Sequence, residues 1–301
     1  MPRKRTKQSG VDAPVVFGAT HVGKVRPGNE DRCRVLEGKD LPDGIDAIMV
    51  VADGMGGHAA GEVASEMTVD GVTRLLISQL PDATIRGKGY PELLGRIIDE
   101  VNLEVLHRAE KEPKYKGMGT TCTVGVLKGS ELYVGHVGDS RGYILEHRGL
   151  VQITKDHSWV AEQVEAGNLT RTEAENHPYR NVVTRAIGIG REVLSDTFVK
   201  SVAPGDKVLL CSDGLHSVVG DSEIGEELKS RDAEAACHKL ISLANDKGGP
   251  DNITVVVAEV GQQDSASTTQ RMDRKGKGGK HERRSPGVLG RIINWLFKPN
   301  R

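Results

Sequence analysis

Four aspartates stand at the ends of apolar segments that have the composition of buried strands. Asp53, Asp139 and Asp213 close the segments IMVVADG, LYVGHVGDS and KVLLCSDG, whereas Asp251 opens the segment PDNITVVVA. Because antiparallel neighbours alternate in direction, this order can bring all four carboxylates to one edge of a β-core. Carboxylates gathered without cations repel each other, so the pattern predicts bound hard metal ions.

A single Asp-Gly or Asp-Ser after a strand is an ordinary turn signal, and any one of these acids alone is more simply a turn residue. Four of them on buried strands favour a metal site. Gly54 lets the backbone approach an ion closely, so its carbonyl could be a further ligand. Oxygen ligands without a His/Cys set suit Mg²⁺ or Mn²⁺, and two such ions about 3.5–4 Å apart would hold a hydroxide for phosphoester hydrolysis.

The segment VRPGNED adds a group that could bind phosphate. Arg26 precedes Glu30 and Asp31 in this segment. The planar guanidinium fits two phosphate oxygens, and the adjacent acids could orient waters bound to the metal ions. Taken alone, this spacing usually marks a solvated charged turn.

The elements that must position these residues can be placed coarsely. The segments IMVVA, VLLC and ITVVV are continuously apolar, which is typical of strands in sheets that are covered on both faces. Apolar residues at helical spacing predict a helix after the Gly-rich turn that follows Asp53 and a second helix over about 91–111. Two more helices are expected near 221–230 and 232–246. Paired helices before and after the strands favour two stacked sheets with helices outside.

Composition and charge limit the remaining possibilities. The chain has 301 residues with 37% hydrophobic but only 3% aromatic residues, so its core must be aliphatic. Residues 261–301 hold ten Lys or Arg and three Asp or Glu, a local net charge of +7, which leaves −8 for residues 1–260. The four cysteines form no CxxC pair and are interpreted as reduced thiols. Without a signal peptide or an apolar run of about 20 residues, the sequence predicts a cytoplasmic protein.

The ends of the chain differ from its body. Residues 1–12 are predicted to be a disordered basic arm, and the body at 13–260 contains no linker-like break. Residues 261–285 are predicted to be a flexible basic linker. Residues 286–301 form a short amphipathic segment that could bind weakly at the inner membrane face. Docking of this segment on the body or on a partner protein is an equally good interpretation.

The segments VRPGNED, ADGMGGHAAGEVAS, GMGTT, HVGDSRGY, CSDGL and GGPDNITVVV together resemble the bacterial form of the metal-dependent serine/threonine protein phosphatases of type 2C. The resemblance covers about residues 15–260 in the expected order. It implies an α+β fold, a four-layer α-β-β-α sandwich of two mainly antiparallel sheets flanked by helices. It also implies a site for two Mn²⁺ or Mg²⁺ ions at one end of the sheets, and a flap at about 155–190 beside it.

The resemblance also implies a role for each acid. Asp53 would bridge both ions, and the Gly54 carbonyl would bind one of them. Asp213 and Asp251 would complete the other. Asp139 matches the position that holds a third, weaker ion.

On the substrate side, the resemblance implies that Arg26 holds the phosphate and that Glu30 is a ligand through water. Many eukaryotic members have a proposed acidic histidine where this chain has Met55, which cannot donate a proton. His58 lies nearby, but a histidine at a helix entry without a chemical role is the simpler interpretation.

The predicted function is hydrolysis of phosphoserine and phosphothreonine in proteins by a metal-bridging hydroxide, opposing Ser/Thr kinases in bacterial signalling. Phosphoproteins and a Ser/Thr protein kinase are the expected partners. The alternative is a catalytically silent phosphatase-fold binding module, which should have lost a metal aspartate, whereas all are present. A metal-dependent nuclease should have a basic groove, but the body is acidic, so no nucleic-acid partner is expected.

Overall fold

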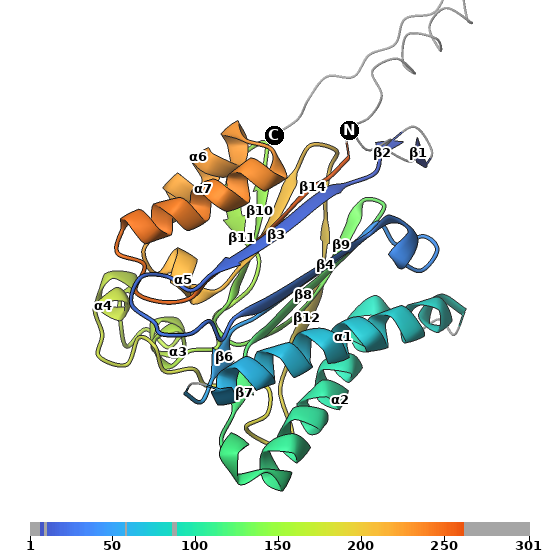
Figure 1. Ribbon diagram of the computed structural model, residues 1–301. Helices are drawn as coiled ribbons and strands as arrows, with labels where there is room; N and C mark the ends of the chain where they lie inside the picture. Colours follow the sequence, from blue (N-terminus) through green and yellow to red (C-terminus); the bar gives the residue numbers. More distant parts are fainter. Residues whose placement is uncertain (1–6, 9–10, 58, 86–88, 262–301) are drawn as a thin grey trace, which may run out of the picture. The chain divides into compact units, whose positions relative to one another are not determined.

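Two five-stranded antiparallel sheets form the centre of the fold in a computed structural model, which describes residues 7–8, 11–57, 59–85 and 89–261 (Figure 1). The first sheet has the order β11 (Gly149–Gln152), β10 (Arg141–Glu146), β13 (Lys207–Cys211), β14 (Ile253–Glu259) and β3 (Val15–His21). The second has the order β12 (Asp196–Ser201), β9 (Glu131–Val137), β8 (Cys122–Lys128), β5 (Ala47–Ala52) and β4 (Arg32–Glu37).

Helices cover the outer face of each sheet. The helices α1 (Ala59–Ile85) and α2 (Tyr90–Lys111) lie on the second sheet, and α6 (Asp221–Ser230) and α7 (Ala233–Asp246) lie on the first (Figure 1). The predicted four-layer α-β-β-α sandwich is therefore confirmed. All four predicted helices are present, although α1 continues to Ile85 with Pro81 inside it.

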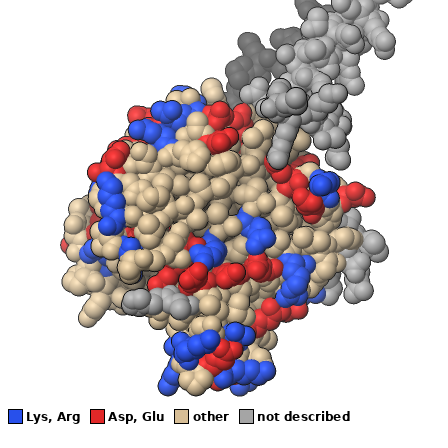
Figure 2. Space-filling view, in the orientation of Figure 1, with Lys and Arg blue, Asp and Glu red and all other residues tan. Residues whose placement is uncertain are grey.

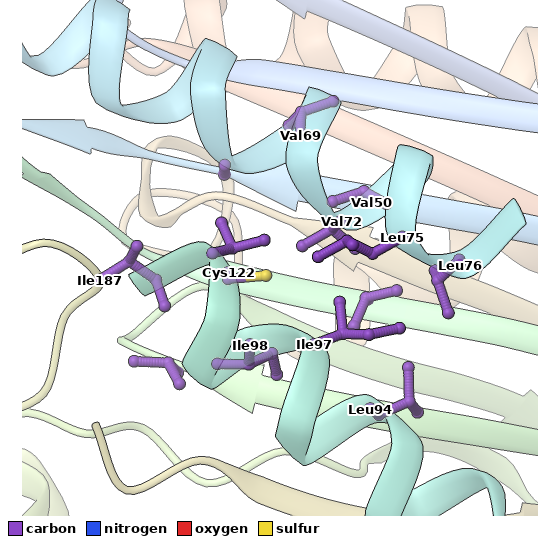
Figure 3. Packing of buried hydrophobic residues seen from close by; sticks show 14 of the residues in the cluster. Val50, Val69, Val72, Leu75, Leu76, Leu94, Ile97, Ile98, Cys122 and Ile187 are labelled. Carbon is purple, nitrogen blue, oxygen red and sulfur yellow. The ribbon is translucent and has the colours of Figure 1, made fainter. Parts of the chain in front are cut away.

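The continuously apolar strands are buried on both faces, as their sequence predicts. In β5, Ile48 and Val50 face the two helices, whereas Met49 and Val51 face the other sheet. Figure 3 shows side chains of α1 and α2 meeting above the second sheet, with Val50 among them. Burial of each such side chain stabilises the folded state by about 1.5–3 kcal/mol. The packing therefore fixes the strands, and with them the residues at the strand ends.

The polar insertion at 155–190 contains two short helices, α3 (Trp159–Glu165) and α4 (Arg171–Glu175). A capping box stands at the start of α4. The Thr170 hydroxyl accepts from the Glu173 backbone amide at 3.2 Å, and the Glu173 carboxylate accepts from the Thr170 amide at 2.8 Å. A bridge between Ser158 and Val183 joins the two ends of the insertion.

Two short strands occur within the segment predicted to be a disordered arm. They are β1 (Lys7–Gln8) and β2 (Val11–Asp12), which pair antiparallel. The remainder of residues 1–12, and the predicted linker and tail beyond residue 261, lie outside the described residues. All four cysteines are free thiols, and among the described helices none is long and apolar enough to cross a membrane.

Candidate active site

Each sheet contributes two of the four aspartates to one pocket. The strands β5 and β9 run in the same direction with β8 between them, so Asp53 and Asp139 leave the second sheet at the same edge. In the first sheet β13 and β14 are antiparallel neighbours, so Asp213 follows one strand where Asp251 precedes the other. All four line a pocket of ≈ 230 Å³, at the end of the sheets where α5 (Asp213–His216) and β6 (Gly54–Met55) lie (Figure 1).

The carboxylates of this pocket perturb one another. Burial raises the pKa of Asp53 well above its usual range, and the charges of Asp31 and Asp213 raise it further. Burial also raises the pKa of Asp139 to about 8 and that of Asp213 to about 6. Oδ1 of Asp213 is buried without a hydrogen-bond partner. These groups therefore form a site that is short of positive charge.

A divalent cation fits this deficit and the donor set. Asp53, Asp139, Asp213 and Asp251 offer only oxygen atoms, which suits Mg²⁺ or Mn²⁺. The described side chains of His, Cys, Asp and Glu include no group of three or more that is already arranged to hold an ion.

Gly54 occupies a position that no larger residue could take. A Cβ atom there would lie 2.2 Å from the Gly61 carbonyl oxygen and 2.6 Å from that of Glu30. The absence of a side chain lets the start of α1 and the Glu30 backbone pack against the pocket wall. Gly54 and Met55 both line the pocket, whereas His58 lies outside the described residues.

Arg26 lies at the rim of the pocket. Its Nη2 atom donates to Oδ2 of Asp251 at 2.7 Å, and its side chain is 53% exposed. The guanidinium therefore reaches the acids from solvent and has other donors to offer to a ligand. Glu30 lines the same pocket.

Asp31 lies behind the pocket and is not part of its lining. The side chain is fully buried, and Oδ2 accepts from the hydroxyls of Ser212 and Thr254, both at 2.7 Å. Burial raises the pKa of Asp31 to about 7, although these two bonds oppose the rise. Its other oxygen, Oδ1, has no hydrogen-bond partner. In the sequence, Ser212 stands next to Asp213 and Thr254 follows Asp251 by three residues, so both lie in segments that carry the family resemblance.

Residues that sequence reasoning missed hold Asp53 in place. The Asp53 backbone amide donates to the Thr121 hydroxyl at 2.9 Å, and the Asp53 carbonyl accepts from the Thr120 hydroxyl at 2.8 Å. The Thr121 hydroxyl also bonds Ser140 at 2.8 Å, which links this group to the residue after Asp139. The sequence signals for this network were the GMGTT and HVGDSRGY segments of the family resemblance.

The flap and a buried histidine complete the surroundings of the pocket. Asn181 and Val183 of the insertion line it beside the acids. His216, on the helix that Asp213 begins, donates through Nε2 to the Asp139 carbonyl at 3.0 Å. Burial lowers the pKa of His216 to about 3, so its ring is neutral and acts as a fixed hydrogen-bond donor.

A second and larger hollow of ≈ 730 Å³ runs along α1 and shares no residue with this pocket. Four of its charged side chains form two ion pairs, Arg34 with Asp70 and Arg74 with Glu104. Figure 2 shows basic and acidic side chains interspersed over one face, without a continuous basic surface among the coloured residues. The smaller pocket is therefore the better candidate for chemistry.

Comparison with known proteins decides the family. A family model described as "Protein phosphatase 2C" matches residues 18–254. The chain belongs to the protein phosphatase 2C family. The matched residues include the pocket acids Asp53, Asp139, Asp213 and Asp251, and also Arg26.

Two relatives within the protein phosphatase 2C family illustrate the likeness. The serine/threonine phosphatase stp of Listeria monocytogenes is 42% identical over 243 residues, which is 80% of this chain and 93% of that protein. The crystal structure of the serine/threonine phosphatase PstP of Mycobacterium tuberculosis is 38% identical, with a TM-score of 0.72 over 82% of this chain and 98% of that one. A PstP catalytic domain in complex with two manganese ions matches with a TM-score of 0.70 at 38% identity, over 82% of this chain and 98% of that one.

Proposed function

We propose that the pocket formed by the two sheet ends is the site at which this protein phosphatase hydrolyses phosphoserine and phosphothreonine in proteins. One observation carries the proposal: aspartates from both sheets line one pocket with an exposed arginine at its rim. Family membership supports serine/threonine dephosphorylation as the activity. Opposition to a Ser/Thr kinase in bacterial signalling is part of the proposal.

Metal ions belong to the proposed site, because the family is metal-dependent and the donor set fits. Asp53 would bridge two Mn²⁺ or Mg²⁺ ions, with the Gly54 carbonyl on one and Asp213 and Asp251 on the other. Asp139 would hold a third. When bound, the ions lower the pKa of a water so that it can attack phosphorus as hydroxide, and they offset charge on the phosphoryl oxygens.

The chain's own residues bind and orient the substrate in this proposal. Arg26 donates to two oxygens of the phosphate from the rim of the pocket. Glu30 would orient waters around the ions, whereas Asp31 lies behind the pocket and accepts from the hydroxyls of Ser212 and Thr254. Met55 lines the pocket but has no proton to give, so the leaving alkoxide takes its proton from water or from another group.

Replacing Arg26 with alanine is expected to raise KM for a phosphothreonine peptide about tenfold and to leave kcat within a few-fold, because the guanidinium binds ground state and transition state alike. Steady-state kinetics with Mn²⁺ present would measure both constants. Arg74→Ala is the matched control, since Arg74 is 57% exposed and also pairs with a carboxylate, Glu104, but lies outside the pocket. An unchanged KM in Arg26→Ala would remove Arg26 from the phosphate site.

The function itself is tested by comparing substrates under the same conditions. The chain should release phosphate from a phosphothreonine peptide with Mn²⁺, should stop when a chelator is added, and should leave DNA intact. A silent binding module would bind the phosphopeptide without releasing phosphate. A nuclease would cleave DNA, which the net charge of −8 over residues 1–260 does not favour.

The domain limits and the tail remain proposals that rest on the sequence. Residues 13–260 would be the catalytic domain with a flap at about 155–190, followed by a basic linker at 261–285. The amphipathic pattern of residues 286–301 would give weak binding to anionic membranes. The full chain should co-sediment with vesicles containing phosphatidylglycerol more than a chain that ends at residue 285. Equal sedimentation of the two chains would contradict membrane recruitment.

A further inference from the structure

A single buried amide holds the loop that carries Arg26. The Asn252 Nδ2 atom donates to the backbone carbonyls of Val22 and Gly28, both at 2.9 Å. Its Oδ1 atom accepts from the Glu30 backbone amide at 2.8 Å. Val22 and Gly28 stand on either side of Arg26 in the chain, so the amide holds the loop both before and after the arginine.

The same loop also packs closely against the segment that precedes β14. The Lys24 amide donates to the Gly249 carbonyl at 2.8 Å. Gly23 has a φ of +80°, and a Cβ atom there would lie only 2.1 Å from the Asp251 carbonyl oxygen. This close approach sets the distance between the arginine loop and Asp251.

Asn252 lines the pocket, but the polar atoms of its side chain bond the backbone of the arginine loop. The residue is only 5% exposed, and both amide atoms are engaged in the three bonds to the loop. Arg26, in contrast, is 53% exposed and has a long flexible side chain, so the position of its guanidinium depends on where the loop holds its backbone.

We propose that Asn252 is a positioning residue for phosphate recognition: its amide fixes loop 22–30 so that Arg26 reaches the substrate phosphate beside Asp251. The inference rests on the proposed function, since it assumes that Arg26 binds phosphate. It assigns Asn252 no contact with the reacting atoms. Its effect on the substrate passes through Arg26.

The structure offers a matched control for a purely structural amide. Asn102 of α2 is also fully buried, accepts from the Gly188 amide at 2.8 Å and donates to the Gly190 carbonyl at 2.8 Å. It holds the end of the flap at residues 188–190 as Asn252 holds the arginine loop, but none of these residues lines the pocket. Asn102→Ala should therefore reproduce the loss of stability without the loss of substrate recognition.

The test is a double-mutant cycle of Asn252→Ala and Arg26→Ala, measured as kcat and KM for a phosphothreonine peptide and as inhibition by inorganic phosphate. Asn252→Ala should raise KM and the phosphate inhibition constant about five- to tenfold, since small misplacement of a binding group is costly. In the Arg26→Ala background the same change should have almost no further effect. Asn102→Ala should leave KM within about twofold at a similar shift in Tm.

Two results would overturn the positioning role. Additive effects in the cycle would show that Asn252 acts independently of Arg26, and equal effects of Asn252→Ala and Asn102→Ala on KM would show a general loss of structure. If Asn252→Ala does not fold, Asn252→Ser is the milder variant, and the same two criteria apply to it. Failure of the proposed function would look different, because the wild-type chain itself would then release no phosphate.

Discussion

Asp53→Asn is expected to lower kcat/KM for a phosphothreonine peptide about a thousandfold or more. Asp53 would bridge both ions, and each ion supplies several kcal/mol of transition-state stabilisation. Asparagine has nearly the same shape and can keep the backbone bonds to Thr120 and Thr121, so the fold should survive. Activity with Mn²⁺ and binding of Mn²⁺ by calorimetry would be measured on the same sample.

The control for this substitution lies beside a strand that also leads to a pocket aspartate. Asp206 precedes β13 and accepts from the Ala203 amide at 2.8 Å, whereas Asp213 follows the other end of that strand. Asp206→Asn should therefore change neither activity nor Mn²⁺ binding. Full Mn²⁺-dependent activity in Asp53→Asn would show that the two-ion assignment is wrong.

Mn²⁺ is expected to raise the Tm of the protein by about 5–10 °C over its value in chelator. Ligand at a hundred times its dissociation constant stabilises a fold by about 2.7 kcal/mol, and each kcal/mol shifts the Tm of a domain of this size by about 2–4 °C. Thermal unfolding of wild type and Asp53→Asn, with and without Mn²⁺, would measure it. The variant should lose most of the gain, and an equal gain in both proteins would contradict the site.

The stability in chelator should also depend on pH with a defined sign. Burial raises the pKa of Asp139 to about 8 and that of Asp31 to about 7, so the folded protein binds protons more tightly than the unfolded chain, where Asp titrates near 4. Stability should therefore fall as pH rises from about 6.5 to 8.5, and the gain from Mn²⁺ should grow. Below pH 6.5, buried His136 and His216 have lowered pKa values, about 4 and about 3, and oppose this trend.

Asp139→Asn provides the comparison for the pH dependence. Without the Asp139 carboxylate, the fall in Tm between pH 6.5 and 8.5 in chelator should be smaller than in wild type. A steeper fall in the variant, or a wild-type Tm that rises with pH in chelator, would contradict the assignment of the repulsion to these acids.

Much of the fold could be predicted from local patterns. Continuous apolar segments predict β5, β13 and β14, and helical spacing predicts α1 and α2, because each pattern reports directly how a segment is buried. The strands β3, β4 and β12 carry no comparable signal. Each lies at the edge of a sheet. The residues of an edge strand such as β12 do not alternate between buried and exposed, so the sequence shows no strand pattern there. Such a strand forms because it pairs with its neighbour.

The sequence alone was enough to select the residues of the candidate site and the kind of chemistry they support. Asp53, Asp213 and Asp251 are marked by the turns that follow or precede buried strands, and the chemistry of clustered carboxylates implies cations whatever the fold. Arg26 and the family resemblance directed this chemistry toward phosphate.

Only the tertiary structure decided how these residues act on one another. It placed Asp31 behind the pocket and paired Arg26 with Asp251, which is 225 residues away in the chain. It also placed the Asn252 amide where it donates hydrogen bonds to the backbone on both sides of Arg26. Such contacts and the pKa shifts of the acids depend on distance and desolvation. Both are set by the stacking of two sheets whose strands are far apart in the chain, and a local sequence pattern contains no information about that stacking.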